Sequence, residues 1–163
     1  MKTALITGSF APITRGHFDL IARTAALFER VEVVIFRNSE KKPLFSEAER
    51  LAWLSAVCRE AGENVRVAIS EDTVAAYAKE RGISLIVKGV RSAADLAYEQ
   101  DMAALNRMAG GCETLFLPTD PALSFVSSSA VREFLRRRLD ARSLLPETIA
   151  DDVIAAYAVR VNG

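Results

Sequence analysis

The sequence predicts an α/β fold, a single Rossmann-like, doubly wound domain in which helices cover both faces of a five-stranded parallel sheet. The first observation behind this prediction is that short apolar or β-branched runs alternate with stretches of helical periodicity. The second is the length of 163 residues, which suits one domain over residues 1–163 with a substantial core. The third is the absence of internal repeats, low-complexity tracts and linkers.

Five short runs have the composition of buried parallel strands, because they are rich in Val, Ile, Leu and Thr. In chain order these strands are expected at Thr3–Ile6, Val31–Phe36, Val65–Ile69, Leu85–Val87 and Thr114–Leu117. Each is followed by a helical pattern, and a helical crossover between strands produces parallel pairing.

Helical patterns fill the intervals between these strands. They cover roughly 17–29, 47–61, 72–81, 93–109, 128–138 and, last, 147–160. The second helix begins with a capping box, in which Ser46 is followed three residues later by Glu49. Gly82 is expected at the C′ position of the third helix, Gly110 and Gly111 end the fourth, and Pro146 precedes the last.

Composition and charge argue against several classes of function. The 21 basic and 21 acidic residues cancel, whereas broad binding to nucleic acid or to a membrane surface needs a basic excess. The start of the chain lacks the apolar core and cleavage site of a signal peptide, and no apolar stretch approaches the roughly 20 residues that span a bilayer. We therefore expect a cytoplasmic protein with neither nucleic acid nor membrane as a partner.

The two cysteines, Cys58 and Cys112, indicate structural thiols. They lie far apart in the sequence and have no CxxC spacing or neighbouring histidine, so the sequence predicts no metal-ligating residues. Cys58 shares a helical face with Leu51 and Leu54, which favours a buried position. Unpaired cysteines of this kind fit a reducing cytoplasm.

The only histidine of the chain, His17, lies where the first strand gives way to the first helix. It closes a segment that starts with Gly8-Ser9-Phe10 and ends with Thr14-Arg15-Gly16-His17. A lone histidine is more often inert than functional. In an open α/β sheet, however, a strand-to-helix turn with glycine presents free N–H groups and a positive dipole end to anions. A functional role for His17 is therefore the better interpretation.

Three more clusters follow strand ends: Lys41-Lys42-Pro43, then Lys88-Gly89-Val90-Arg91, and then Ser124-Phe125-Val126-Ser127-Ser128-Ser129. Taken singly, they also fit a solvated loop, surface ion pairs and a helix cap. Their recurrence at equivalent strand ends predicts a pocket for a polyphosphate instead.

The pattern of residues favours transfer chemistry without a covalent intermediate. No second histidine is present to activate a serine, and the P-loop spacing of Gly, four residues and Gly-Lys-Ser/Thr is missing. The chemistry would then consist of positioning and charge stabilisation, which suits direct phosphoryl or nucleotidyl transfer.

A family resemblance runs from about Ala4 to Pro146. It is carried by the motifs Gly8-Ser9-Phe10 with Thr14-Arg15-Gly16-His17, Lys41-Lys42-Pro43, Gly89-Val90-Arg91, Asp95 with Tyr98-Glu99, Asn106-Arg107, and Ser124-Phe125-Val126-Ser127-Ser128-Ser129. With them the chain resembles the bacterial phosphopantetheine adenylyltransferases, within the nucleotidyltransferase superfamily that bears a (T/H)xGH motif. The first motif specifies the superfamily, and the others together point to this family.

The resemblance implies adenylyl transfer from ATP to 4′-phosphopantetheine, which gives dephospho-CoA and pyrophosphate in coenzyme A biosynthesis. It implies in-line attack without a covalent enzyme intermediate, Mg²⁺ as cofactor, CoA as a further ligand and a homohexamer. The implied catalytic residues are His17, Lys41 and Lys88. Those implied for the acceptor are Ser9, Lys41, Val74 and Lys88. Those implied for ATP are Ser9, Phe10, His17, Gly89, Val90, Arg91, Glu99, Leu123, Ser124, Phe125, Val126, Ser127, Ser128 and Ser129.

The chain departs from the family pattern at a few positions. Ala11 stands where the family has Asp, Lys88 stands where it has Arg, and Phe36 and Arg37 are bulkier than the usual residues. Two alternatives stay open. One is a related transferase with another acceptor, such as a nicotinate mononucleotide adenylyltransferase or a glycerol-3-phosphate cytidylyltransferase. The other, which Ala11 and Lys88 support, is a nucleotide- or CoA-binding protein without turnover.

The physical role expected of His17 is that of a neutral hydrogen-bond donor. The acceptor's own phosphate is the nucleophile in such a reaction, so no protein base is required. The positive end of the first helix disfavours an imidazolium, and we therefore expect a neutral ring that donates to the α-phosphate.

Overall fold

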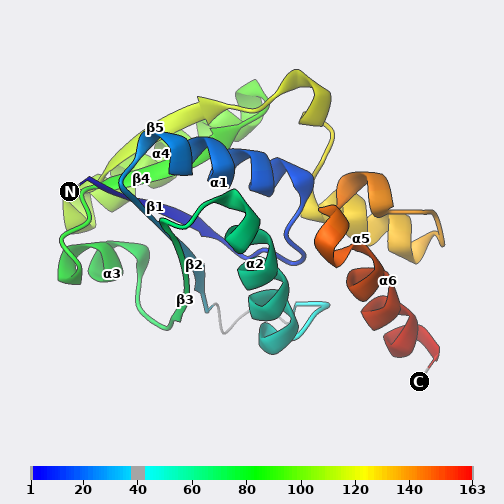
Figure 1. The fold of residues 1–163 in the computed structure, drawn as a ribbon. Coiled ribbons are helices and arrows are strands. Elements are labelled where there is room, and N and C mark those ends of the chain that lie inside the picture. Colours follow the sequence, from blue (N-terminus) through cyan, green and yellow to red (C-terminus); the bar gives the residue numbers. More distant parts are fainter. Residues whose placement is uncertain (1, 38–42, 163) are drawn as a thin grey trace.

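The five strands of the structure form one parallel sheet with the order β3-β2-β1-β4-β5 (Figure 1). A computed structural model describes residues 2–37 and 43–162 of the chain. The strands are β1 (Thr3–Gly8), β2 (Arg30–Phe36), β3 (Val65–Ser70), β4 (Leu85–Val90) and β5 (Glu113–Pro118). The chain runs outward from β1 to β3 and then returns to the other side of β1 with β4. This return creates the topological switch point between β1 and β4, where open α/β sheets bind ligands.

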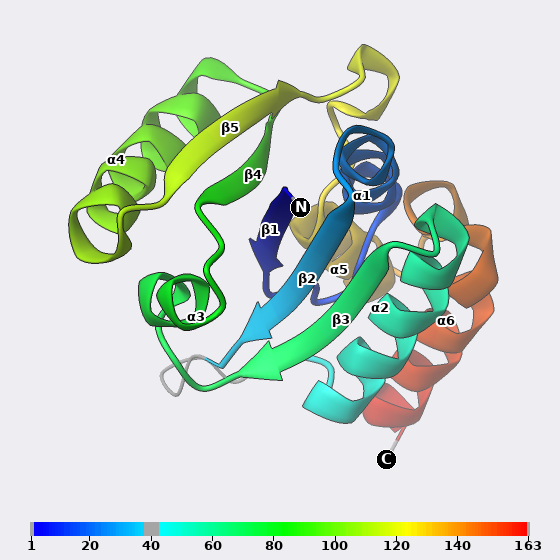
Figure 2. The ribbon, with the colours of Figure 1, turned by 60° about the vertical axis from the view of Figure 1, so that its left-hand side comes forward.

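Helices cover both faces of the sheet, so the predicted doubly wound α/β class is confirmed. They are α1 (Arg15–Leu27), α2 (Glu47–Ala61), α3 (Val74–Glu80), α4 (Ala93–Gly110), α5 (Ser128–Arg136) and α6 (Glu147–Asn162). Figure 2 shows α3 and α4 on one side of the sheet and α1, α2 and α6 on the other. Short 3₁₀ turns at Pro121–Leu123 and Arg142–Leu144 flank α5.

The helix ends follow the chemistry of their terminal residues. Helices α1 to α5 each begin after a Ser or Thr whose side chain accepts a hydrogen bond from a backbone N–H of the first turn. The capping box predicted at Ser46 and Glu49 is present in full. Gly82 and Gly111, just after α3 and α4, have φ angles of 64° and 70°, a region that glycine enters without steric cost.

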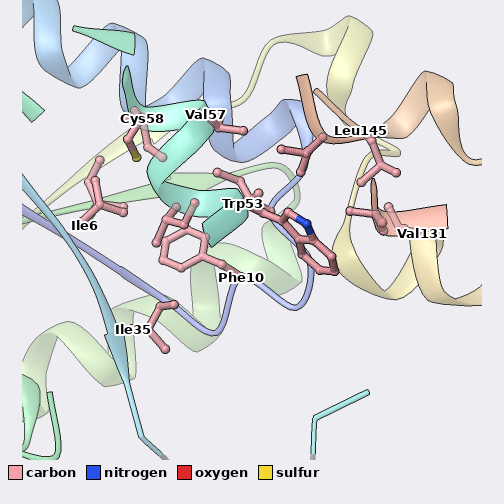
Figure 3. Close-up of a cluster of buried hydrophobic side chains, with 14 of the residues drawn as sticks. Ile6, Phe10, Ile35, Trp53, Val57, Cys58, Val131 and Leu145 are labelled. Atoms are coloured by element: carbon pink, nitrogen blue, oxygen red, sulfur yellow. The ribbon is translucent and has the colours of Figure 1, made fainter. Parts of the chain in front are cut away.

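The larger core fills the space between the sheet and helices α1, α2, α5 and α6. In Figure 3 the side chains labelled in this cluster are Ile6, Phe10, Ile35, Trp53, Val57, Cys58, Val131 and Leu145. Trp53 packs edge-to-face on Phe45 with 5.0 Å between the ring centroids. Burial raises the pKa of the Cys58 thiol to about 12. Cys58 is therefore a neutral packing residue, as the sequence predicts.

A smaller core lies on the opposite face, beneath α3. Its centre is Tyr77, whose hydroxyl donates to the buried Glu32 carboxylate at 2.9 Å. Helix α4, by contrast, contributes no buried residue over its 18 residues. Across residues 2–37 and 43–162, the structure contains no helix with the length and apolar character that a bilayer crossing demands.

Candidate functional site

A cavity of about 330 Å³ opens at the carboxyl edge of the sheet, at the switch point between β1 and β4. Helices α1, α4 and α5 supply its walls. The residues expected in the site from the sequence that line this cavity are Ser9, Phe10, His17, Lys88, Gly89, Arg91, Glu99, Val126, Ser127, Ser128 and Ser129. The structure thus brings together three of the four strand-end clusters.

Several other expected site residues do not line the cavity. Phe125 is 66% exposed, and Ser124 is exposed beside it. Leu123 packs against the larger core, and Val74 packs against the smaller one. Val90 ends β4 outside the lining. Lys41, together with Lys42, lies outside the described residues.

The cavity also has polar lining residues that the sequence did not assign to the site. They are Thr7, Asp19, Arg23, Asp95, Thr119 and Arg132. Helical spacing carried a signal for three of them, because residues three or four apart lie on one helix face. Gly16, Asp19 and Arg23 follow that spacing on α1, and Arg132 follows Ser128 and Ser129 on α5. Thr7 and Thr119 offered no comparable pattern.

The turn between β1 and α1 places Phe10 under the site. Phe10 has a φ angle of 44°, in the left-handed region, and its ring is only 1% exposed. A Cβ atom on Gly8 would lie 3.0 Å from Cζ of that ring. The absence of a side chain at position 8 therefore allows the close approach of the Phe10 ring. The ring in turn packs edge-to-face against His17, with 5.1 Å between centroids.

The tautomer of His17 is fixed by Thr14, the N-cap residue of α1. The backbone N–H of Thr14 donates to Nδ1 of His17 at 3.0 Å. Because that N–H can only donate, Nδ1 must be the unprotonated nitrogen, and the proton of the neutral ring resides on Nε2. His17 is the N3 residue of a capping box, and it holds the acceptor role that Glu or Gln usually has there. Nε2–H is left as the donor at the cavity.

The His17 ring is neutral at physiological pH. Burial, followed by the positive charges of Arg91 and Lys88, lowers the pKa of His17 to about 4. The neutral state expected from the sequence agrees with this value. The neutral ring was expected from the helix dipole, whereas the main causes of the low pKa are burial and two neighbouring cations. A ring in this state donates one hydrogen bond and cannot act as a proton acceptor at Nε2.

Positive charge is distributed unevenly around the cavity. Lys88 lies 3.5 Å from a carboxylate oxygen of Glu99, and Arg23 lies 3.1 Å from one of Asp19. Arg91 and Arg132 have no carboxylate partner among the residues that the structure describes. No carboxylate of the described residues therefore neutralises these two guanidinium groups, which line the cavity, and the charge of Arg91 acts directly on His17.

Comparisons with known proteins agree with this geometry. A family model described as cytidylyltransferase-like matches residues 5–134. A phosphopantetheine adenylyltransferase of Streptomyces coelicolor is 42% identical over 93% of this chain and 94% of its own length. One of Bifidobacterium longum is 38% identical over 97% and 96%, respectively.

The chain belongs to the phosphopantetheine adenylyltransferase family. The resemblance identified from the sequence motifs is thereby confirmed. A solved structure of a proposed nicotinate-nucleotide adenylyltransferase from Vibrio parahaemolyticus superposes with a TM-score of 0.68. It is 17% identical, and the match covers 96% of each chain, which supports the Rossmann-like fold alone.

Proposed function

We propose that this protein transfers the adenylyl group of ATP to the phosphate of 4′-phosphopantetheine, giving dephospho-CoA and pyrophosphate. The observation that carries the proposal is His17, a neutral Nε2–H donor that lines the cavity together with Lys88 and Arg91 in a chain from this family. A fixed neutral donor flanked by cations suits a reaction in which negative charge builds up on a phosphorus centre.

The reaction needs no protein base. An oxygen of the acceptor phosphate attacks the α-phosphorus of ATP, a P–O bond forms, and the bond to the β-phosphate breaks as pyrophosphate leaves. Phosphate monoesters are largely ionised near pH 7, since their second pKa lies near 6, so the nucleophile arrives deprotonated. Positioning and electrostatics supply the catalysis.

His17 would stabilise the transition state through Nε2–H. Loss of one such donor typically lowers the rate by about 10²–10³-fold. Lys88, with Lys41, would hold the acceptor phosphate. Because Lys88 is paired with Glu99 in the structure, the incoming phosphate would compete with that carboxylate for the ammonium group.

The wall of the cavity formed by Arg91 and the start of α5 would hold the triphosphate. Arg91 and the run from Ser127 to Ser129 line this wall, and α5 begins within the run. Ser127 already uses its hydroxyl as the N-cap of α5, where it accepts from Ala130 N–H. The Ser128 hydroxyl donates to the carbonyl of Pro12 at 2.7 Å. The Ser129 hydroxyl, the free N–H groups at the start of α5 and the guanidinium group of Arg91 provide the anion-binding chemistry that ATP requires.

Mg²⁺ fits this cavity as a companion of the nucleotide. Asp19 is paired with Arg23, Glu99 is paired with Lys88, and Asp95 accepts from the backbone N–H of Arg91 at 3.2 Å. The described residues contain no group of three or more His, Cys, Asp or Glu side chains suited to a metal. The ion would then be held by triphosphate oxygens and water, with Asp95 as the nearest suitable carboxylate. When bound, Mg²⁺ offsets the negative charge of the triphosphate.

The proposed assembly is a homohexamer in the cytoplasm. Its support is the apolar surface of α4 and β5, where Tyr98, Leu105, Met108 and Leu115 are all exposed. Apolar patches of this kind mark interfaces. Two buried, unpaired cysteines fit a reducing compartment. Light scattering should report the mass of six copies, and Met108→Glu should lower that mass.

The test of the function is pyrophosphate release from ATP with 4′-phosphopantetheine, measured beside His17→Ala. We expect release in the wild type and a loss of about 10²–10³-fold in kcat for the variant. Parallel reactions with CTP, nicotinate mononucleotide or glycerol 3-phosphate test a related transferase. Equal rates for the wild type and the variant would remove His17 from the mechanism. Tight CoA binding without any release would favour the binding protein that Ala11 and Lys88 suggested.

A further inference from the structure

The turn between β1 and α1 is tied to two other helices through its backbone carbonyl groups. Nη1 of Arg50, on α2, donates to the carbonyl of Ser9 at 2.8 Å. Nη1 of Arg132, on α5, donates to the carbonyl of Ala11 at 2.7 Å. The hydroxyl of Ser128, also on α5, donates to the carbonyl of Pro12 at 2.7 Å. Three side chains distant in sequence thus define the path of this turn.

The turn needs such support because its conformation is costly. Phe10 has a φ angle of 44°, which a residue with a Cβ adopts only when its surroundings impose it. The described backbone–backbone hydrogen bonds outside the regular elements include none that starts or ends at residues 9–13. Side-chain donors therefore take the place that backbone partners have in a regular turn.

The path of the turn determines the state of His17. Thr14, two residues after Pro12, fixes Nδ1 of His17 by its backbone N–H. A shift of the carbonyl groups at Ala11 and Pro12 would move that N–H and release the ring. The effect of α5 on the imidazole therefore passes through the turn, because the charges that lower the pKa of His17 belong to Arg91 and Lys88.

Arg132 joins the turn between β1 and α1 to the start of α5. Its Nη2 donates to the hydroxyl of Ser129 at 3.1 Å while its Nη1 holds the carbonyl of Ala11. A planar guanidinium group can satisfy both acceptors at once, and an ammonium group cannot reproduce that fork. Arg132 lines the cavity, and none of the carboxylates in the described residues pairs with it.

We propose that Arg132 is a positioning residue for adenylyl transfer, which holds the turn between β1 and α1 so that His17 presents Nε2–H to the reacting phosphate. The expected effect on catalysis rests on the proposed function. The control of the His17 ring by Arg132 can be tested whether or not the protein uses ATP.

The first measurement is ¹⁵N NMR of the imidazole, which gives one unambiguous signal set because the chain has one histidine. The wild type should show protonation at Nε2 only. Arg132→Gln should mix the two tautomers and raise the pKa of His17 toward 6.5. Arg136→Gln is the matched control, because Arg136 lies one turn further along α5 and pairs with Glu133 at the surface. An unchanged tautomer in Arg132→Gln would overturn the proposal.

The second measurement separates kcat from KM. Misplacement of a catalytic group by about 1 Å can lower the rate by about 10²-fold, so Arg132→Gln should lower kcat to that extent with little change in the KM for ATP. Arg132→Lys should recover little of the loss, since lysine keeps the charge without the fork. A raised KM with an unchanged kcat would instead make Arg132 a simple phosphate ligand and overturn the positioning role.

A third variant covers the case in which Arg132→Gln does not fold. Ser128→Ala removes only the donor to the carbonyl of Pro12 and leaves the guanidinium group in place. It should disturb the same tautomer to a smaller degree. A Ser128→Ala protein with an intact Nε2–H signal and wild-type kcat would contradict the argument that the turn transmits the effect.

Discussion

The low pKa of His17 makes a quantitative prediction about stability that is independent of any ligand. Burial, Arg91 and Lys88 lower the pKa of His17 to about 4, from 6.5 for an unperturbed histidine. The unfolded chain therefore binds a proton more readily than the folded one between these two values. The free energy of unfolding must then fall as the pH decreases through this window.

The size of the effect follows from the two pKa values. The full difference of about 2.5 pKa units is worth about 3 kcal/mol at 1.36 kcal/mol per unit. The linkage relation gives a fall of about 2 kcal/mol in the free energy of unfolding when the pH is lowered from 8 to 5. His17→Gln lacks the titrating ring but keeps a side chain that can accept from Thr14 N–H. The wild type should lose about 2 kcal/mol more than this variant over the same range.

Urea denaturation followed by the fluorescence of Trp53, the only tryptophan, measures this difference at pH 5, 6, 7 and 8. Comparison with His17→Gln cancels the contributions of the carboxyl groups, which titrate in both proteins. Parallel curves of unfolding free energy against pH for the two proteins would refute the assignment of a buried neutral imidazole. So would an NMR titration of His17 with a midpoint near 6.5.

Three further predictions concern single side chains around the same ring. Gly8→Ala brings a Cβ atom to 3.0 Å from the Phe10 ring and should lower the unfolding free energy by about 1–3 kcal/mol, measured with urea. Thr14→Val removes the N-cap hydroxyl of α1 and should cost about 0.5–2 kcal/mol in the same assay; no loss would contradict the capping role. Lys88→Met removes a charge that lowers the pKa of His17, so NMR should show a higher value, and kinetics should show a raised KM for the acceptor.

The parts of the fold that depend on local sequence were predictable. The strands were found because β-branched residues cluster in short runs, and the start of the second helix was found because Ser46 and Glu49 form a capping box. The predicted fourth strand ended at Val87, and β4 continues to Val90. The extra residues include Lys88 and Gly89. Lysine and glycine are uncommon in strands, so nothing in the sequence favoured extending the strand through them.

The parts of the site that depend on distant contacts were not predictable. Arg50 and Arg132 reach the turn across sequence separations of 41 and 121 residues, and no local pattern indicates that their guanidinium groups donate to its carbonyl groups. Nothing in the sequence indicated that the close neighbour of Gly8 is the ring of Phe10. Phe125 belongs to a serine-rich motif, but its side chain is largely exposed and does not line the cavity.

The arrangement of charges explains why a neutral histidine serves this site. Lys88 and Arg91 already provide the positive charge beside the ring, and both penalise a third cation through their fields. An imidazolium would be stable only after a phosphate had neutralised its neighbours. A neutral Nε2–H carries no such cost, and its hydrogen bond strengthens as negative charge accumulates on the phosphate oxygen. The interaction is thereby concentrated in the transition state. Rate constants for transfer should accordingly show no inflection attributable to His17 between pH 6 and pH 9.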